Sequence, residues 1–453
     1  MVKHDVSRRD FVMRASSAAG ASLAAKTILL DPVASYAQNT PVAANDRLRM
    51  GMIGVGEQGA GVLRRAVAHP GIECVAACDL WDGRHTLAQE IVGKPIKCTR
   101  HYQELLDDKD IDIIINATPD HWHSKIVVDS CNAGKDIYSE KPMSHDVAEG
   151  FAMVAAAEKH KRIVEIGSGA ADSWTSMKAK DLIASGAIGD VHTIEVSTGR
   201  NTPNGAWASW MPPPGLSPDN LDWNTWLGNA PKIPFDPIRF ARWRGYRAYG
   251  TGVAGDLMVH LLTALINSAG FKEPPLRAHS TGGLYVFKDG REYPDVHHVI
   301  FDYPNVQVIV KLILTCETQE SARYYGTRGL LEIGGNGITI TPQDGKDHDP
   351  GWYQSGYPKA MRDAYEKQWH LDHDADAPKK RPEPVVYRNA EPGRELDHMG
   401  IFFEAVRTRN PKIVTEDAAF GNNAAIACHM ANASYFSKSV AVWDAKANRI
   451  RTA

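Results

Sequence analysis

The chain has 453 residues, of which 43% are hydrophobic and 23% are charged, and its formal net charge at pH 7 is −3. This composition is typical of a globular protein, and the length suits two domains better than one. A net charge so close to zero gives no electrostatic reason to expect nucleic acid or an anionic membrane as a partner. The six cysteines are scattered without a CxxC pair, so no disulfide framework is expected.

The first 37 residues predict a twin-arginine export signal. The sequence Ser-Arg-Arg-Asp-Phe begins at Ser7, a weakly apolar stretch runs from Ala15 to Leu30, and small residues permit cleavage after Ala37. Lys26 interrupts the apolar stretch, which makes it a poor membrane anchor. We therefore expect export of the folded protein to the periplasm or another extracytoplasmic compartment, with no membrane contact after cleavage. The alternative is a chance pair of arginines in a tail.

Residues 47–166 alternate short apolar strands with helical segments. Met50–Ile53, Cys74–Cys78 and Ile111–Ala117 are apolar runs typical of strands that are buried on both faces. A helical segment extends from Gly59 to Ala68, and further strands are expected around Cys98, at 137–139 and at 163–166. This alternation predicts an α/β fold whose N-terminal part is a Rossmann domain with a doubly wound parallel sheet.

Residues 167–445 predict a second domain with a different kind of sheet. Val191–Val196 and Val306–Leu314 alternate in polarity, as strands of a mixed or antiparallel sheet do when one face is covered. Residues 201–250 are rich in Pro, Trp, Asn and Gly and are expected to form a long ordered insertion over the site. No regular structure is expected from 343 to 393, whereas Asp397–Arg407 and Asp417–Ser437 are predicted helices.

A Gly-x-Gly-x-x-Gly turn follows the first strand of residues 47–166. Gly54, Gly56 and Gly59 leave the backbone amides and a helix N-terminus free to approach a pyrophosphate. Asp79 lies 20 residues beyond Gly59, at the end of the next strand, where a carboxylate binds the adenine ribose and repels a 2′-phosphate. The expected cofactor is therefore NAD, although Arg84 keeps NADP possible. The alternative is a structural glycine turn with a helix-capping Asp.

Four local signatures make the chain resemble the Gfo/Idh/MocA oxidoreductase family, which includes inositol dehydrogenases and glucose–fructose oxidoreductase. They are the glycine turn, Thr-Pro-Asp-His-Trp-His from Thr118, Ala-Gly-Lys at 133–135 leading to Glu-Lys-Pro from Glu140, and Gly-Asp-Leu-Met-Val-His from Gly255. The resemblance covers most of residues 47–445. It implies a Rossmann domain, a C-terminal α/β domain with a large open, mostly antiparallel sheet, a substrate held between them, and assembly as a dimer or tetramer.

Lys141, Asp256 and His260 are the expected catalytic residues. Asp256 and His260 are four residues apart, so on a helix they share a face, where the carboxylate would raise the basicity of the imidazole. His260 then suits a general base, and the Lys141 ammonium would stabilise a developing alkoxide. The resemblance assigns catalysis to the same three positions. The alternative is a buried ion pair that only holds two domains together.

Further contacts are expected around these residues. The cofactor contacts, in addition to the glycines, Asp79 and Lys141, are expected to be Glu57, Gln58, Thr118, Pro119, His123 and Glu140. No metal is expected, because the histidines around Trp122 have no carboxylate or cysteine cluster beside them. The expected substrate contacts are Trp207, Arg242 and Tyr246, which would offer a stacking surface and polar partners to a sugar. Their alternative role is packing within the insertion.

The expected activity is NAD(P)-dependent hydride transfer to or from a secondary hydroxyl of a sugar, polyol or glycoside. Export of the protein suggests a tightly held cofactor, because no nicotinamide pool would be available outside the cytoplasm. An alternative is a redox-neutral, NAD-dependent glycoside hydrolase or lyase that forms a transient ketone and eliminates the glycosidic substituent. A third possibility is a sugar-binding protein without catalysis, which would have no need of the three catalytic residues.

Overall fold

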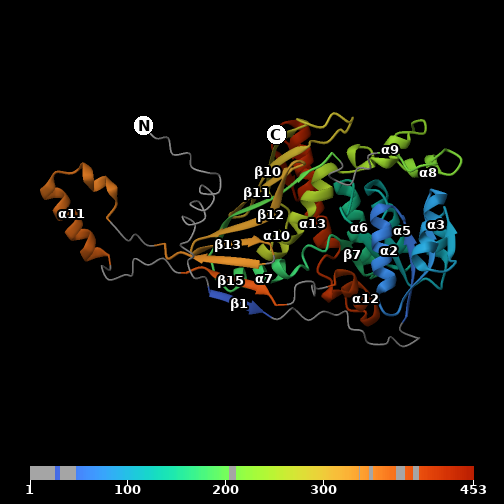
Figure 1. The fold of residues 1–453 in the computed structure, drawn as a ribbon, viewed down its shortest axis with the longest axis horizontal. Helices are drawn as coiled ribbons and strands as arrows, with labels where there is room; N and C mark the ends of the chain where they lie inside the picture. The colour runs from blue at the N-terminus through green and yellow to red at the C-terminus, as the bar shows by residue number, and fades with distance from the viewer. Residues whose placement is uncertain are drawn as a thin grey trace, which may run out of the picture.

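The computed structural model describes residues 26–30, 47–203, 211–335, 337–345, 350–373, 383–390 and 397–453. The described chain contains two sheets, one of six strands and one of eleven, and helices pack against both (Figure 1). The fold is therefore α/β with a Rossmann-type sheet followed by a second, larger sheet, as the sequence predicts.

The six-stranded sheet is the parallel sheet of a Rossmann domain, with strand order β4-β3-β2-β5-β6-β7. Its strands are β2 (Leu48–Ile53), β3 (Ile72–Cys78), β4 (Lys97–Thr99), β5 (Ile113–Asn116), β6 (Asp136–Glu140) and β7 (Val164–Gly167). The connecting helices are α2 (Glu57–Ala68), α3 (Asp82–Val92), α4 (Gln103–Asp107), α5 (Asp120–Asn132) and α6 (Val147–His160). Helices cover both faces, which is why a strand such as β5 is apolar almost throughout and fully buried.

A helix from the far end of the chain completes one face of the Rossmann sheet. Phe402 and Phe403 of α12 (His398–Thr408) belong to the same buried cluster as Met50 of β2 and Ile113 of β5. Figure 1 draws α12 beside the Rossmann helices, although hundreds of residues separate them in the sequence. The sequence predicts this helix but not its location, because an amphipathic pattern identifies a buried face and not what covers it.

The eleven-stranded sheet has the order β1-β15-β14-β13-β12-β8-β11-β10-β9-β16-β17. All neighbouring strands are antiparallel except the pairs β1·β15 and β11·β8, so the sheet is mostly antiparallel as predicted. Its strands include β8 (Val191–Asn201), β9 (Arg277–Gly283), β10 (Val296–Tyr303), β11 (Val306–Ile313), β12 (Thr315–Gly326), β13 (Gly329–Gly334), β14 (Gly337–Pro342), β16 (Ala441–Asp444) and β17 (Arg449–Thr452). Helices α7 (Trp174–Ala184), α10 (Val259–Ala269) and α13 (Ala418–Ser437) contribute to its buried core.

Two segments differ from the sequence-based expectation. Lys26–Leu30 forms β1, which pairs with β15 (Val385–Asn389) at one edge of the large sheet, inside the predicted export signal. Residues 343–393 contain β15 and the helix α11 (Lys359–Asp372), where no regular structure was expected. Strand β15 forms because it pairs with the edge of β14. A short apolar run between polar residues does not reveal in its sequence that a distant strand will pair with it. No helix in the described ranges combines the length and apolarity needed to span a bilayer.

Three buried histidines predict an acid-sensitive fold. Burial lowers the pKa of His121, His297 and His429 to about 4 each. The unfolded chain binds these protons below about pH 6.5, so their stabilising contribution is complete above that pH and is lost as the pH falls toward 4. The free energy of unfolding should fall by up to about 1.4 kcal/mol per pH unit for each histidine. Denaturant unfolding at pH 7, 6 and 5 measures the free energy of unfolding at each pH. If this free energy falls with pH as steeply in His297→Gln as in wild type, the contribution of His297 is contradicted.

Candidate active site

The glycine turn between β2 and α2 is sterically required. Gly54 has a φ of 85°, and a Cβ there would lie 2.8 Å from the backbone of Ala117. A Cβ on Gly59 would lie 2.1 Å from the carbonyl oxygen of Gly54, a distance that no side chain tolerates. The turn therefore presents bare backbone beside the start of α2 at Glu57, and this is the arrangement that binds a phosphate.

A cavity of about 320 Å³, called here the glycine cleft, lies against this turn. It is next to β2 and β5, where the strand order reverses, and open parallel sheets bind ligands at such points. Its lining includes seven of the expected cofactor contacts, namely Gly54, Gly56, Glu57, Gln58, Asp79, Thr118 and Pro119. Gly59 is buried and instead allows α2 to pack closely on the turn.

Asp79 and Arg84 lie together in the glycine cleft. Asp79 accepts hydrogen bonds from the backbone N–H of Val55 (2.8 Å) and of Trp81 (3.0 Å). The Arg84 guanidinium donates to the Val55 carbonyl (2.6 Å) and lies over the Trp81 ring, 5.3 Å from its centroid. A Cβ on Gly56 would lie 2.9 Å from Arg84 Nη1, so a larger residue would require the Arg84 side chain to move. The open cradle and its carboxylate fit a dinucleotide.

A second cavity of about 440 Å³, called here the lysine cavity, contains the expected chemistry. Lys141, Glu140 and His260 line it, and it shares Gln58 and Thr118 with the glycine cleft. The two cavities are therefore neighbours. Other lining residues that sequence analysis did not assign to the site are Ser168, Arg200, Trp243, Arg244, Asp397 and His398.

Lys141, Asp256 and Arg244 form one charged network. Lys141 Nζ donates to the carbonyl oxygen of Asp256 (2.6 Å) and to its carboxylate (3.0 Å), and Arg244 Nε donates to the same carboxylate oxygen (3.1 Å). Burial alone would raise the pKa of Asp256, but the two cations outweigh it and lower the pKa to about 2. Asp256 Oδ2 is buried and has no hydrogen-bond partner among the described residues. The network thus fixes the Lys141 ammonium at the wall of the cavity.

His260 is held through the hydroxyl groups of Ser168 and Thr263. Thr263 Oγ1 donates to the His260 carbonyl (3.2 Å), and Ser168 Oγ lies 2.7 Å from Thr263 Oγ1 and 3.3 Å from His260 Nδ1. All three contacts are satisfied when the Ser168 hydroxyl donates a hydrogen bond to Thr263 Oγ1 and accepts one from the Nδ1–H of His260. This tautomer leaves a lone pair on Nε2. The imidazole can therefore accept a proton.

The expected pairing of Asp256 with His260 is not what the structure shows. Residues Ala254–Met258 form a π-helical turn before α10, and the Asp256 carboxylate is engaged by Lys141 and Arg244. The pKa of His260 is lowered to about 3, chiefly by burial and next by Lys141, although Asp256 partly opposes the change. The expectation of a raised basicity was therefore wrong. His260 is neutral at physiological pH because it is desolvated beside a cation.

Two of the expected cofactor contacts, Glu140 and His123, make hydrogen bonds that hold the loops of the site together. Glu140 accepts a hydrogen bond from Gln58 Nε2 (3.0 Å), which joins the end of β6 to the glycine turn. His123 is buried and lines neither cavity, and its ring nitrogens face the carbonyl oxygens of Pro142 (2.7 Å) and Thr118 (2.9 Å). It holds together the two loops that carry Thr118 and Lys141.

The expected substrate contacts do not gather at the lysine cavity. Trp207 lies outside the described residues, while Arg242 and Tyr246 line a small separate pocket of about 30 Å³. Trp243 and Arg244, which lie between them in the sequence, line the lysine cavity, and the Arg244 guanidinium is 4.2 Å from the centroid of the Trp243 ring. In a segment without periodicity, the sequence cannot tell which neighbour faces the site. The rest of the insertion packs on itself around Trp223 and Trp226, whose rings stack at 4.8 Å.

The fold and the glycine cleft define an α/β protein with a Rossmann-type dinucleotide-binding domain. Residues 48–168 match the family model described as "Oxidoreductase family, NAD-binding Rossmann fold", and residues 174–267 match that of the C-terminal α/β domain of the same family. In these two ranges the chain is therefore similar to the Gfo/Idh/MocA oxidoreductase family, and its N-terminal domain matches an NAD-binding Rossmann domain.

Curated relatives and solved structures agree with this class. The inositol 2-dehydrogenase of Salmonella typhimurium (strain LT2) is 33% identical over 144 residues, which are 31% of this chain and 43% of the relative. A "Glycosyl hydrolase family 109 protein" of Shewanella baltica (strain OS155) is 31% identical over 177 residues, 35% of this chain and 38% of the relative. The matched part thus spans less than half of these relatives.

Similar folds extend over more of the chain. A levoglucosan dehydrogenase in complex with NADH and levoglucosan has a TM-score of 0.60 at 16% identity, covering 87% of this chain and 98% of the other. The aldose-aldose oxidoreductase from Caulobacter crescentus, complexed with glycerol, has a TM-score of 0.57 at 17% identity and covers 87% and 99%. At these identities the likeness establishes the fold.

Proposed function

We propose that this protein transfers a hydride between NAD and a secondary hydroxyl of a sugar, polyol or glycoside. The observation that carries the proposal is the shared wall of the two cavities, since Gln58 and Thr118 belong both to the dinucleotide cradle and to the cavity that contains Lys141 and His260. A substrate in the lysine cavity would therefore lie next to the cofactor. The similarity to an inositol 2-dehydrogenase and to a levoglucosan dehydrogenase supports the substrate class.

The chain supplies the proton transfer and the charge stabilisation. Bound NAD would supply the hydride acceptor. His260 Nε2 carries the lone pair that accepts the hydroxyl proton, and Ser168 and Thr263 hold the ring in that tautomer. The Lys141 ammonium, held by Asp256, stabilises negative charge on the substrate oxygen. Asp256 acts through Lys141, and Arg244 helps to position its carboxylate.

Trp243 is the aromatic residue best placed to stack on a sugar ring, because it lines both cavities. Replacing Trp243 by Ala should raise KM for the sugar about tenfold, the cost of losing one aromatic contact, with a smaller effect on kcat. Steady-state kinetics on the sugar that reduces bound NAD would measure both constants. The matched control is Trp223→Ala, which removes an indole packed within the insertion and should lower the thermal midpoint without changing KM. Equal KM changes in both variants would contradict the assignment.

A redox-neutral glycosidase is the second candidate. The relatives named as glycosyl hydrolase family 109 proteins support it. In that reaction Lys141 and His260 would assist the oxidation of the sugar to a transient ketone. A later elimination would release the glycosidic substituent. Incubation with aryl glycosides distinguishes the two, since stoichiometric oxidation without aglycone release supports the dehydrogenase. Catalytic release of aglycone would favour the glycosidase.

We further propose that the protein is exported by the twin-arginine route with its cofactor already held, and that it works as a homo-oligomer. The Arg-Arg sequence and the following apolar stretch support export. Protein purified without added nucleotide and then denatured should release about one NAD per chain, identified by absorbance and mass. An empty protein would contradict tight retention, while hydride transfer after adding NAD would still support the activity. Cell fractionation and light scattering test the location and the assembly.

A further inference from the structure

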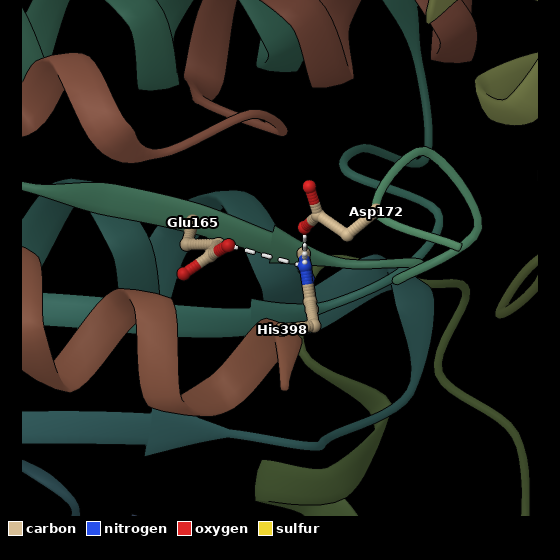
Figure 2. A group of neighbouring side chains, drawn as sticks. All are labelled: Glu165, Asp172 and His398. Carbon is tan, nitrogen blue, oxygen red and sulfur yellow. Dashed lines mark hydrogen bonds and ion pairs between the residues drawn. The ribbon is translucent and has the colours of Figure 1, made fainter. Parts of the chain in front are cut away.

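A buried group of ionisable side chains lies behind the lysine cavity. Glu165 is on β7, Asp172 is in the loop between β7 and α7, and His398 is the first residue of α12. His398 Nδ1 lies 2.6 Å from Asp172 Oδ2 and 3.1 Å from Glu165 Oε1, so both carboxylates converge on one ring nitrogen (Figure 2). Three segments that are distant in the sequence thus bring two oxygen ligands and one nitrogen ligand to one point.

The carboxylates have too few hydrogen-bond donors. Glu165 is fully buried and Asp172 is 1% exposed. Among the described residues, neither Glu165 oxygen has a hydrogen-bond partner of good geometry, and Asp172 Oδ1 has none. A third buried carboxyl group, Glu416, faces the same loop by accepting a hydrogen bond from the backbone N–H of Ala171 (3.0 Å), and its Oε2 is also without a partner. Buried oxygens without a hydrogen-bond partner are costly, and a bound cation would satisfy them.

We propose that Glu165, Asp172 and His398 bind a divalent first-row transition-metal ion such as Zn²⁺ or Mn²⁺. Their ligand atoms all lie within 4.8 Å of one another. Two metal–ligand bonds of about 2.1 Å at a tetrahedral angle place their ligand atoms about 3.4 Å apart, so the two ligand atoms that lie farthest apart would have to approach by up to about 1.4 Å to close the site. The mixed nitrogen and oxygen set favours such an ion over Mg²⁺ or Ca²⁺, which take oxygen ligands.

The other nitrogen of His398 has the partner that a metal ligand needs. Nε2 lies 3.1 Å from the carbonyl oxygen of Ile166. A proton on Nε2 makes this a hydrogen bond and leaves the lone pair of Nδ1 for the metal, as is usual where a histidine binds a metal. The ion would replace the Nδ1 proton.

The proposed ion has a structural role next to the site. It joins β7 to α12, the helix from the later part of the chain that covers the Rossmann sheet, and to the loop that follows β7. That loop begins at Ser168, whose hydroxyl contacts His260. Of the three ligands, only His398 lines the lysine cavity. The ion would therefore fix the loop that orients His260, and it would not contact the substrate.

The test measures metal binding by the full-length protein. After treatment with EDTA and dialysis, wild type titrated with Zn²⁺ or Mn²⁺ should bind about one equivalent per chain, with a higher thermal midpoint. Glu165→Gln keeps the shape of the side chain but removes a ligand, and it should bind at least about tenfold more weakly. The matched control is His297→Asn, which removes a buried histidine outside the group and should bind as wild type does.

A structural measurement covers the case in which Glu165→Gln folds poorly. Anomalous diffraction at the zinc edge from wild-type crystals soaked in Zn²⁺ should give a peak within bonding distance of His398 Nδ1 and both carboxylates. A peak elsewhere, no stoichiometric binding by folded wild type, or equal binding by Glu165→Gln would each overturn the proposal. Equal affinity for Mg²⁺ would overturn the choice of a transition metal.

Discussion

Replacing Lys141 by Met is expected to lower kcat by at least about a thousandfold while NAD remains bound. Methionine keeps the length of the side chain but removes the ammonium that would stabilise the substrate alkoxide. Lys141 lines the lysine cavity and not the glycine cleft, so the dinucleotide cradle stays intact. The Asp256 carboxylate keeps its contact with Arg244. The rate at which sugars reduce the bound nicotinamide measures kcat, and denaturation of the same sample measures its NAD content.

The matched control for Lys141→Met is Lys135→Met, at the opposite end of β6. Lys135 is also buried, and its Nζ donates to the carbonyl oxygens of Asp108 and Ile111 (2.6 Å each). Its loss should lower the thermal midpoint and leave kcat unchanged. Turnover of Lys141→Met at the wild-type rate would remove Lys141 from the mechanism. An equal loss in both variants would mean that folding, and not chemistry, was affected.

Replacing Asp79 by Ser should shift the ratio of NADP to NAD affinity by about 10- to 100-fold toward NADP. The carboxylate would bind the ribose hydroxyls of NAD and repel a 2′-phosphate. Without it, the Arg84 guanidinium is well placed for that phosphate, because it already lies in the same corner against Val55 and Trp81. Calorimetric titration of the nucleotide-free protein with each cofactor gives the ratio.

A double variant separates the two contributions to cofactor choice. If Arg84 contacts the 2′-phosphate, adding Arg84→Met to Asp79→Ser should abolish the gain in NADP affinity and leave the loss in NAD affinity. If Asp79→Ser leaves the ratio unchanged, the carboxylate serves only the turn, where it accepts hydrogen bonds from Val55 and Trp81. That result would favour the structural alternative for this residue.

Much of the Rossmann domain can be predicted from the sequence because its signals are local. The apolar runs at β2, β3 and β5 mark buried strands, and the glycine spacing marks the turn that follows β2. Asp79 is predicted as the cofactor carboxylate because it stands at the end of the next strand. The structure places it in the same cleft as the glycine turn. Each inference needs only a short window of residues and the geometry of one strand or turn.

The lysine cavity could be predicted only in part. Lys141 and Asp256 are 115 positions apart, and their contact depends on how the two domains meet. The proximity of Asp256 to His260 in sequence was misleading, because the nearer cations Lys141 and Arg244 take the carboxylate and burial decides the pKa of the imidazole. Trp243 and Arg244 were candidates in the sequence but were not chosen over Arg242 and Tyr246, because an irregular segment gives no periodic signal for the side that faces the cavity.

Strand polarity and glycine spacing are properties of neighbouring residues, and they sufficed to predict the Rossmann fold, the mostly antiparallel second sheet and the dinucleotide turn. Which groups share a site could be seen only in the folded chain. His398 reaches Asp172 across 226 positions, and α12 covers the Rossmann sheet from the other end of the chain. The physical reason is that burial, charge pairing and desolvation depend on distances between atoms, and those distances exist only after the chain has folded.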